Sequence, residues 1–131
     1  MDDFSKEQGL SDDQVSVMQQ AARAAIAYRE TLHDAPARPP LGLEDMAARF
    51  MGELAEGGMP ERAVIDHIVE ASEGGLHKMA APTFFGYVLG GSHPVGVAAD
   101  FLVSAWGQNA GSAFETPAIA AMERGGLQLG D

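Results

Sequence analysis

The chain has 131 residues, a formal net charge of −11 at pH 7 and no cysteine, and 46% of its residues are hydrophobic. This length fits one domain, and the composition is that of a globular chain rather than a disordered one. The negative charge argues against binding to nucleic-acid phosphates or to an anionic membrane surface. The lack of cysteine excludes disulfides, thiolate zinc ligands and cysteine nucleophiles from the chain.

The N-terminal residues are acidic and polar. They lack the basic and apolar regions of a secretory signal, and no apolar run in the sequence reaches membrane-spanning length. We therefore expect a cytoplasmic protein whose residues 1–10 form a mobile N-terminus.

The spacing of apolar residues predicts helices and no strand over residues 1–75. Ser11 followed by Gln14 has the form of a capping box, and two aspartates follow Ser11 at the positive end of the expected helix. A helix should therefore start at Ser11 and end near Leu32 or His33.

A proline-rich segment follows this helix. Residues 34–42 hold three of the seven prolines, which cannot continue a helix, so we expect an extended linker there. Two shorter amphipathic helices should come next, one over residues 43–55 and one from Pro60 to the glycine pair at 74 and 75.

Residues 94–106 predict a further helix that is apolar on almost every side. Such a helix is expected to be buried all round, and Asp100 alone interrupts it. A buried structural carboxylate, bonded to backbone amides or an arginine, is the favoured interpretation of Asp100. Three short helices leave part of this surface uncovered, so we expect another chain or a missing domain to cover it, in a dimer or an aggregate.

Residues 82–110 have the composition of a site wall. They combine the aromatic residues Phe84, Phe85 and Tyr87 with a glycine turn that contains His93. The turn matches neither a P-loop nor a dinucleotide motif, and its glycines suit close approach of either a ligand or another part of the chain. His93 is interpreted first as a turn residue, with a site-lining role as the alternative. The four histidines show no metal-ligand spacing.

The helix expected at 94–106 is followed by two amide side chains. Gln108 and Asn109 are placed to satisfy free carbonyls at the helix end, and they could equally line a pocket.

The run FFGYVLGGSHPVGVAADFLVSAWGQNA, together with Thr116, Pro117 and Glu123, resembles the N-terminal part of a known enzyme family. That family is the group II pyridoxal-phosphate-dependent amino-acid decarboxylases, which act on aromatic amino acids, glutamate or histidine. The resemblance covers residues 82–123 and extends more loosely to the preceding helices. It implies a carboxy-lyase of fold type I that forms an intertwined homodimer, in which residues 11–81 wrap around the partner subunit.

The resemblance also implies roles for individual residues. Residues between Phe85 and Gly90 would line the substrate side of the pocket. The stretch from Asn109 to Gly111 would reach toward the partner's site. The implied substrate-binding residues are Phe85, Tyr87, Val88, Leu89, Gly90, His93, Asn109 and Gly111.

The family's catalytic groups are a cofactor-binding lysine, an aspartate and a histidine, and all three belong to a large domain. The lysines of this chain, Lys6 and Lys78, do not match that position. We therefore expect no catalytic residue, no metal site and no bound pyridoxal 5'-phosphate in this chain alone, and whether it acts as an enzyme stays open.

The expected fold class is thus mainly α, the N-terminal helical segment of a fold type I enzyme whose large α/β cofactor domain is missing. Residues 82–124 would form the wall motif and buried helix, and residues 125–131 a tail that departs from the family pattern after Arg124. A frameshift, a truncation or a split polypeptide would explain that departure. Two functions remain open: a decarboxylase segment, or a non-catalytic helical module for interaction and dimerisation derived from that family. The expected partner is a second copy of the chain, the missing large domain or a full-length paralogue.

Overall fold

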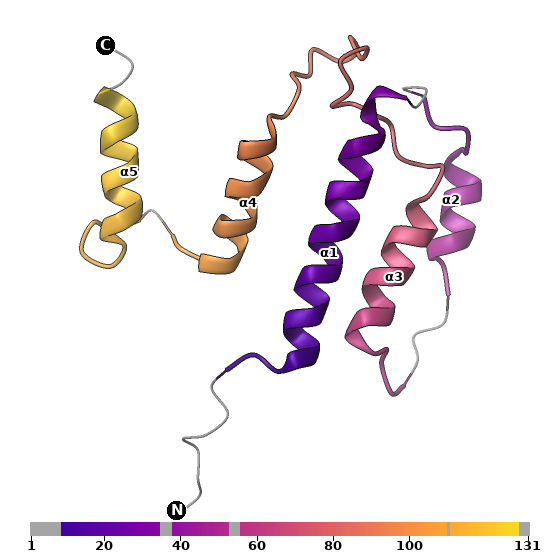
Figure 1. Ribbon diagram of the computed structural model, residues 1–131, viewed down its shortest axis with the longest axis horizontal. Coiled ribbons are helices and arrows are strands. Elements are labelled where there is room, and N and C mark those ends of the chain that lie inside the picture. The colour runs from indigo at the N-terminus through magenta and orange to yellow at the C-terminus, as the bar shows by residue number, and fades with distance from the viewer. Residues whose placement is uncertain (1–8, 35–37, 53–55, 110, 129–131) are drawn as a thin grey trace, which may run out of the picture. The chain divides into compact units, whose positions relative to one another are not determined.

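The computed structural model describes residues 9–34, 38–52, 56–109 and 111–128 (Figure 1). The chain is mainly helical, with 59% helix, five α-helices and no strand within these ranges, as the sequence predicted. None of these helices combines the length and apolar character needed to cross a membrane. The helices are α1 (Asp12–Glu30), α2 (Leu43–Phe50), α3 (Glu61–Ser72), α4 (Pro94–Trp106) and α5 (Pro117–Gln128), and a short 3-10 turn (Thr31–His33) follows α1.

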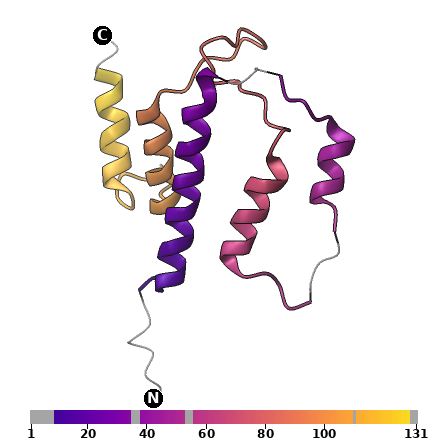
Figure 2. The same ribbon diagram turned by 45° about the vertical axis from the view of Figure 1, so that its right-hand side comes forward.

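The chain divides into two compact units, Met1–Gly91 and Ser92–Asp131. The first unit contains α1, α2 and α3, and the second contains α4 and α5. In the first unit α3 lies between α1 and α2 and packs against both (Figures 1 and 2).

Helix α1 begins at the predicted capping box. The Ser11 hydroxyl accepts a hydrogen bond from the Gln14 amide (3.2 Å), and the Gln14 side chain accepts one from the Ser11 amide (3.0 Å). The α-helix ends at Glu30, and the 3-10 turn continues to His33, which agrees with the predicted end. This turn buries Leu32, which is 5% exposed.

Helices α1 and α3 are joined by side-chain hydrogen bonds. The Gln20 amide donates to the Arg62 carbonyl (3.3 Å) and to the Asp66 carboxylate, and Arg62 donates to the Ser16 hydroxyl. The buried hydrophobic residues in the described ranges are small in number and size, namely Leu32, Ala71 and Ala81. Polar contacts therefore accompany a thin apolar core in this unit.

Helix α2 is shorter than predicted. It ends at Phe50 because Met51 turns extended, with ψ of 122°, and the glycine that follows is a poor helix former. The last part of the prediction, residues 53–55, lies outside the described residues. Arg49 donates to the Glu73 carbonyl (2.7 Å) and the Leu41 amide donates to the Gly74 carbonyl (3.1 Å), which ties α2 to the turn after α3.

The bounds of α4 agree with the prediction, whereas its burial stays a prediction, because the cover was expected from another chain or a missing domain. His93 caps its start, Pro94 occupies its first turn and Gly107 ends it in the left-handed conformation, with φ of 57°. No residue of α4 is buried, since within its unit α4 does not pack against α5. Asp100 is likewise exposed in the single chain, so its predicted burial depends on the same cover.

Helix α5 continues through the glycine pair at 125 and 126 to Gln128. The sequence predicted that these glycines begin a tail that departs from a helical pattern. Neither glycine has a neighbour within 4 Å of an added Cβ, so the helix tolerates a side chain at both positions.

Replacing Gly74 with alanine is expected to destabilise the first unit. Gly74 has a φ of +81°, and an added Cβ would lie 2.9 Å from Leu41 Cδ1. We expect a loss of about 1–2 kcal/mol in the free energy of unfolding, measured by urea denaturation. Gly57→Ala is the matched control, because Gly57 has open space and no positive φ. Equal stability of the two variants would contradict the close packing of Leu41 on this turn.

The double variant Gly125→Ala/Gly126→Ala is expected to strengthen α5. Alanine is favoured over glycine inside a helix by about 1 kcal/mol per residue. Far-UV circular dichroism should show more helix than in the parent chain, whereas Gly91→Ala, in a loop with open space, should leave the signal unchanged. An unchanged helical signal in the double variant would show that α5 does not extend through the glycines.

Candidate functional site

The predicted wall residues of the first unit lie on the loop that follows α3. The first residues of this loop contact α1. The Lys78 ammonium lies 3.8 Å from the centre of the Tyr28 ring and donates a hydrogen bond to the Thr31 hydroxyl (2.9 Å). The Tyr28 hydroxyl donates to the His77 carbonyl at 3.5 Å. These contacts fix the start of the loop at the C-terminal end of α1.

An aromatic cluster, formed by His77, Phe84 and Tyr87, holds the middle of the loop. The His77 ring meets Phe84 edge to face, with ring centres 4.9 Å apart, and Tyr87 lies 6.0 Å from Phe84 and 6.4 Å from His77. Such aromatic pairs contribute about 0.5–1.5 kcal/mol each beyond area burial. The cluster therefore orders a segment that has no regular secondary structure.

Sequence reasoning gave no role to His77 or Lys78. Lys78 contacts a residue 47 positions earlier, and Tyr28 and His77 are 49 positions apart. Contacts over such separations leave no local pattern. The one available signal was the place of these two residues just ahead of the aromatic run.

A strained turn carries the centre of the wall. The Leu89 amide donates to the Gly86 carbonyl (3.3 Å), and Tyr87 and Val88 between them have φ of 58° and 56°. Two positive φ angles at the centre of a turn are typical of type I′ turns, which favour Asn-Gly. A β-branched residue there is a conformational outlier.

The strained turn points its apolar side chains outward. Val88 is 104% exposed, Phe85 is 90% exposed and Tyr87 is 75% exposed. Leu89 and Gly90 are exposed as well. The structure thus brings these five predicted residues onto one loop and leaves them uncovered. They offer apolar contact area and one phenol hydroxyl, without a carboxylate or an imidazole among them.

The other three predicted site residues, His93, Asn109 and Gly111, lie in the second unit and are exposed. His93 Nδ1 accepts a hydrogen bond from the Val95 amide (3.4 Å), so His93 serves as the cap of α4. The Asn109 carbonyl accepts from the Thr116 hydroxyl (2.8 Å), which ties the end of α4 to the start of α5.

Gln108 satisfies a free carbonyl at the end of α4, which is one of the two roles predicted for it. The Gln108 side chain donates to the Trp106 carbonyl (2.9 Å), a group that the helix leaves free.

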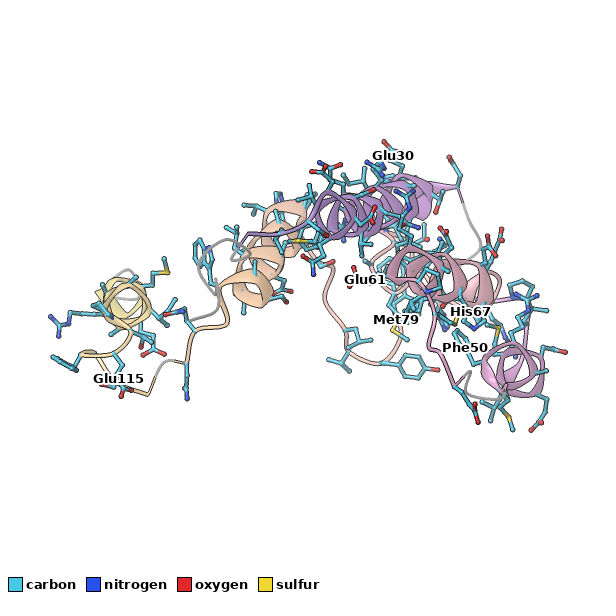
Figure 3. All side chains as sticks on the ribbon, turned by 90° about the horizontal axis from the view of Figure 1, so that it is seen from below. Glu30, Phe50, Glu61, His67, Met79 and Glu115 are labelled. Atoms are coloured by element: carbon cyan, nitrogen blue, oxygen red, sulfur yellow. The ribbon has the colours of Figure 1, made fainter. Side chains whose placement is uncertain are left out.

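The described residues include no cluster of three or more histidine or acidic side chains that could hold a metal ion. His67 instead packs its ring edge against Phe50, with ring centres 6.0 Å apart, and both side chains are labelled in Figure 3. Lys78 is the lysine of the described ranges, and its ammonium is already engaged by Tyr28 and Thr31. These residues do not fit the covalent attachment of pyridoxal phosphate.

Replacing Val88 with glycine is expected to stabilise the turn. Glycine accepts positive φ without strain, so the urea midpoint of the first unit should rise, by up to about 1 kcal/mol in unfolding free energy after the entropy of the unfolded glycine is counted. Val88→Ala removes the same exposed side chain but keeps a Cβ, and it should gain less. If alanine stabilises the chain as much as glycine does, the gain does not come from φ.

Comparison with known proteins gives no match. No protein-family model, no curated protein and no solved structure is similar to this chain at a significant level. The resemblance to the group II decarboxylases therefore rests on the residues of the motif itself.

Proposed function

We propose that this chain is the N-terminal segment of a group II pyridoxal-phosphate-dependent amino-acid decarboxylase, a cytoplasmic homodimer. In this role it supplies one wall of the substrate pocket and contacts between subunits. The observation that carries the proposal is the exposed apolar turn at Tyr87 and Val88. The loop that carries this turn is bonded to α1 and packed by aromatic rings, and the resemblance assigns the wall of the substrate pocket to these residues.

The contacts that order this loop suit it to line one wall of a substrate pocket. Its start is tied to α1 through Lys78, and its centre is packed on His77, so the outward side chains are presented from an ordered base. A pocket wall acts by excluding water and by orienting a substrate side chain, which requires apolar surface rather than acid or base groups. Phe85 and Val88 offer such surface, and the Tyr87 hydroxyl can donate or accept one hydrogen bond.

The groups that carry out decarboxylation would belong to a large domain and its cofactor. Pyridoxal phosphate, when bound, supplies the electron sink for the departing carboxylate's electrons. The described residues of this chain do not fit that cofactor, because Lys78 is engaged on α1 and no carboxylate lies among the wall residues. The proposal therefore gives this chain a binding role and assigns the reaction to a large domain.

A second candidate is a non-catalytic helical module for interaction and dimerisation, derived from the same family. The observation that favours it is that none of the apolar residues of α4 is buried. In this candidate the loop that carries Phe85, Tyr87 and Val88, here called the wall loop, does not contact a substrate. The surface of α4 still binds a partner.

The two candidates differ in a complementation experiment. The chain is mixed with a group II decarboxylase from which the corresponding N-terminal segment has been removed, and carbon dioxide release from the amino-acid substrate is measured. We expect the chain to restore activity. Tyr87→Ala should lower kcat/KM about tenfold, which corresponds to about 1.4 kcal/mol of lost transition-state binding.

Arg23→Gln is the matched control, because Arg23 is exposed on α1, outside the wall. It should restore activity as well as the parent chain does. No restored activity with a folded chain, or equal losses for Arg23→Gln and Tyr87→Ala, would overturn the wall role. A stoichiometric aldimine formed by the chain alone with pyridoxal phosphate, and trapped by borohydride, would contradict the statement that it lacks a cofactor lysine.

A further inference from the structure

Helices α2 and α3 of the first unit share an apolar face. On α3, Val64 and Ile68 lie four residues apart and therefore on one side of the helix. On α2, Leu43 and Phe50 lie seven residues apart, which also places them on one side. These four residues are named the α2–α3 face.

The packing of the two helices brings the four residues to the same side of the pair. Phe50 meets His67 edge to face (Figure 3), and Met46 lies against Gly75, so α2 and α3 run antiparallel. Around each helix, the residues of the face follow the contact residues His67 and Met46 by about 40–100°. In an antiparallel pair, rotations of the same sense around the two helices lead to the same side.

The helices of the first unit leave this face uncovered. Leu43 is 80% exposed, and Phe50 and Ile68 are each 49% exposed. Ala71 is the one buried residue of α2 and α3. Apolar surface of this kind gains about 25 cal/mol for each Å² that a partner removes from water.

The charges of α2 and α3 select a basic partner for the face. Both arginines of these helices donate to neutral groups, Arg49 to the Glu73 carbonyl (2.7 Å) and Arg62 to the Ser16 hydroxyl. The carboxylates of the two helices outnumber the arginines by five to two, and they are Glu44, Asp45, Glu61, Asp66 and Glu70. Charge repulsion disfavours an acidic partner, including a second copy of this chain with its net charge of −11.

We propose that the α2–α3 face binds a basic amphipathic helix of another protein. The apolar side of that helix covers Phe50 and Ile68, and its lysine or arginine side chains meet the carboxylates beside the face. Glu61 is such a carboxylate, because it lies three residues before Val64 on the same side of α3. This inference goes beyond the proposed function, since it uses neither the wall loop nor α4.

The affinity should be modest and sensitive to salt. Four apolar side chains offer less area than a standard interface, so we expect a dissociation constant on the order of ten micromolar. The charge contacts lie at the exposed edge of the face, where added salt screens them. Binding should therefore weaken, without being abolished, as salt is raised.

A synthetic helix is the probe for this face. It is a fluorescent peptide of about 15 residues in which leucines form one side and lysines the other, and its anisotropy is measured as the full chain is added. The same peptide with glutamate in place of lysine should not bind. A scrambled peptide, with the same leucines and lysines but no apolar side, should bind at least about tenfold more weakly.

Two pairs of variants separate this face from general attraction to an acidic chain. Ile68→Gln should weaken peptide binding at least about fivefold, whereas Ile26→Gln, which changes an equally exposed isoleucine of α1, should leave it unchanged. Glu61→Gln should weaken binding about twofold at low salt. Glu30→Gln lowers the net charge equally at the end of α1 and should have no effect (Figure 3).

Amide chemical shifts of the unmodified chain locate the peptide without any variant. Addition of the lysine peptide should shift amide signals of α2 and α3 most. Largest shifts outside α2 and α3, equal binding of the amphipathic and scrambled peptides, or no binding at all would overturn the proposal. Equal losses for Ile68→Gln and Ile26→Gln would overturn it as well. Neither result bears on the complementation experiment, which depends on the wall loop.

Discussion

The packing of α3 against α1 is the contact on which the first unit depends. Helix α2 is attached to α3 and to the turn after it, through Arg49 and Leu41, and the wall loop begins where that turn ends. The loop then returns to α1, where Lys78 meets Tyr28. The three helices thus form a base that presents a short irregular segment, and binding segments are commonly displayed on regular elements in this way.

Apolar surface without cover is the feature that the two units share. The first presents Phe85 and Val88 on a strained turn, and the second presents the exposed apolar residues of α4. The described ranges bury only Leu32, Ala71 and Ala81 as hydrophobic residues, although apolar burial is the main source of folding free energy. Apolar surface of this kind would be stabilised by association, and both proposed functions, the decarboxylase segment and the interaction module, depend on such a contact.

Local signals in the sequence predicted the helices well. The capping box at Ser11 marks the start of α1, and Pro94 with Gly107 marks both ends of α4, because these residues act within one turn of the helix. Burial was not predictable in the same way. Composition predicted a buried α4 that another chain or a missing domain would cover, but composition does not say which elements pack together, and within its unit α4 does not pack on α5. The aromatic cluster at His77 was missed because it depends on distant contacts.

Hydrogen exchange at increasing protein concentration tests the central claim of the proposed function, that α4 is a surface for association between chains. Amide exchange in Pro94–Trp106 should slow as the concentration rises through the micromolar range, because pairing stabilises a helix that is marginal alone. Exchange in α1 and α3, which pack on each other within one chain, should stay constant. Protection of α4 that does not depend on concentration would contradict the claim.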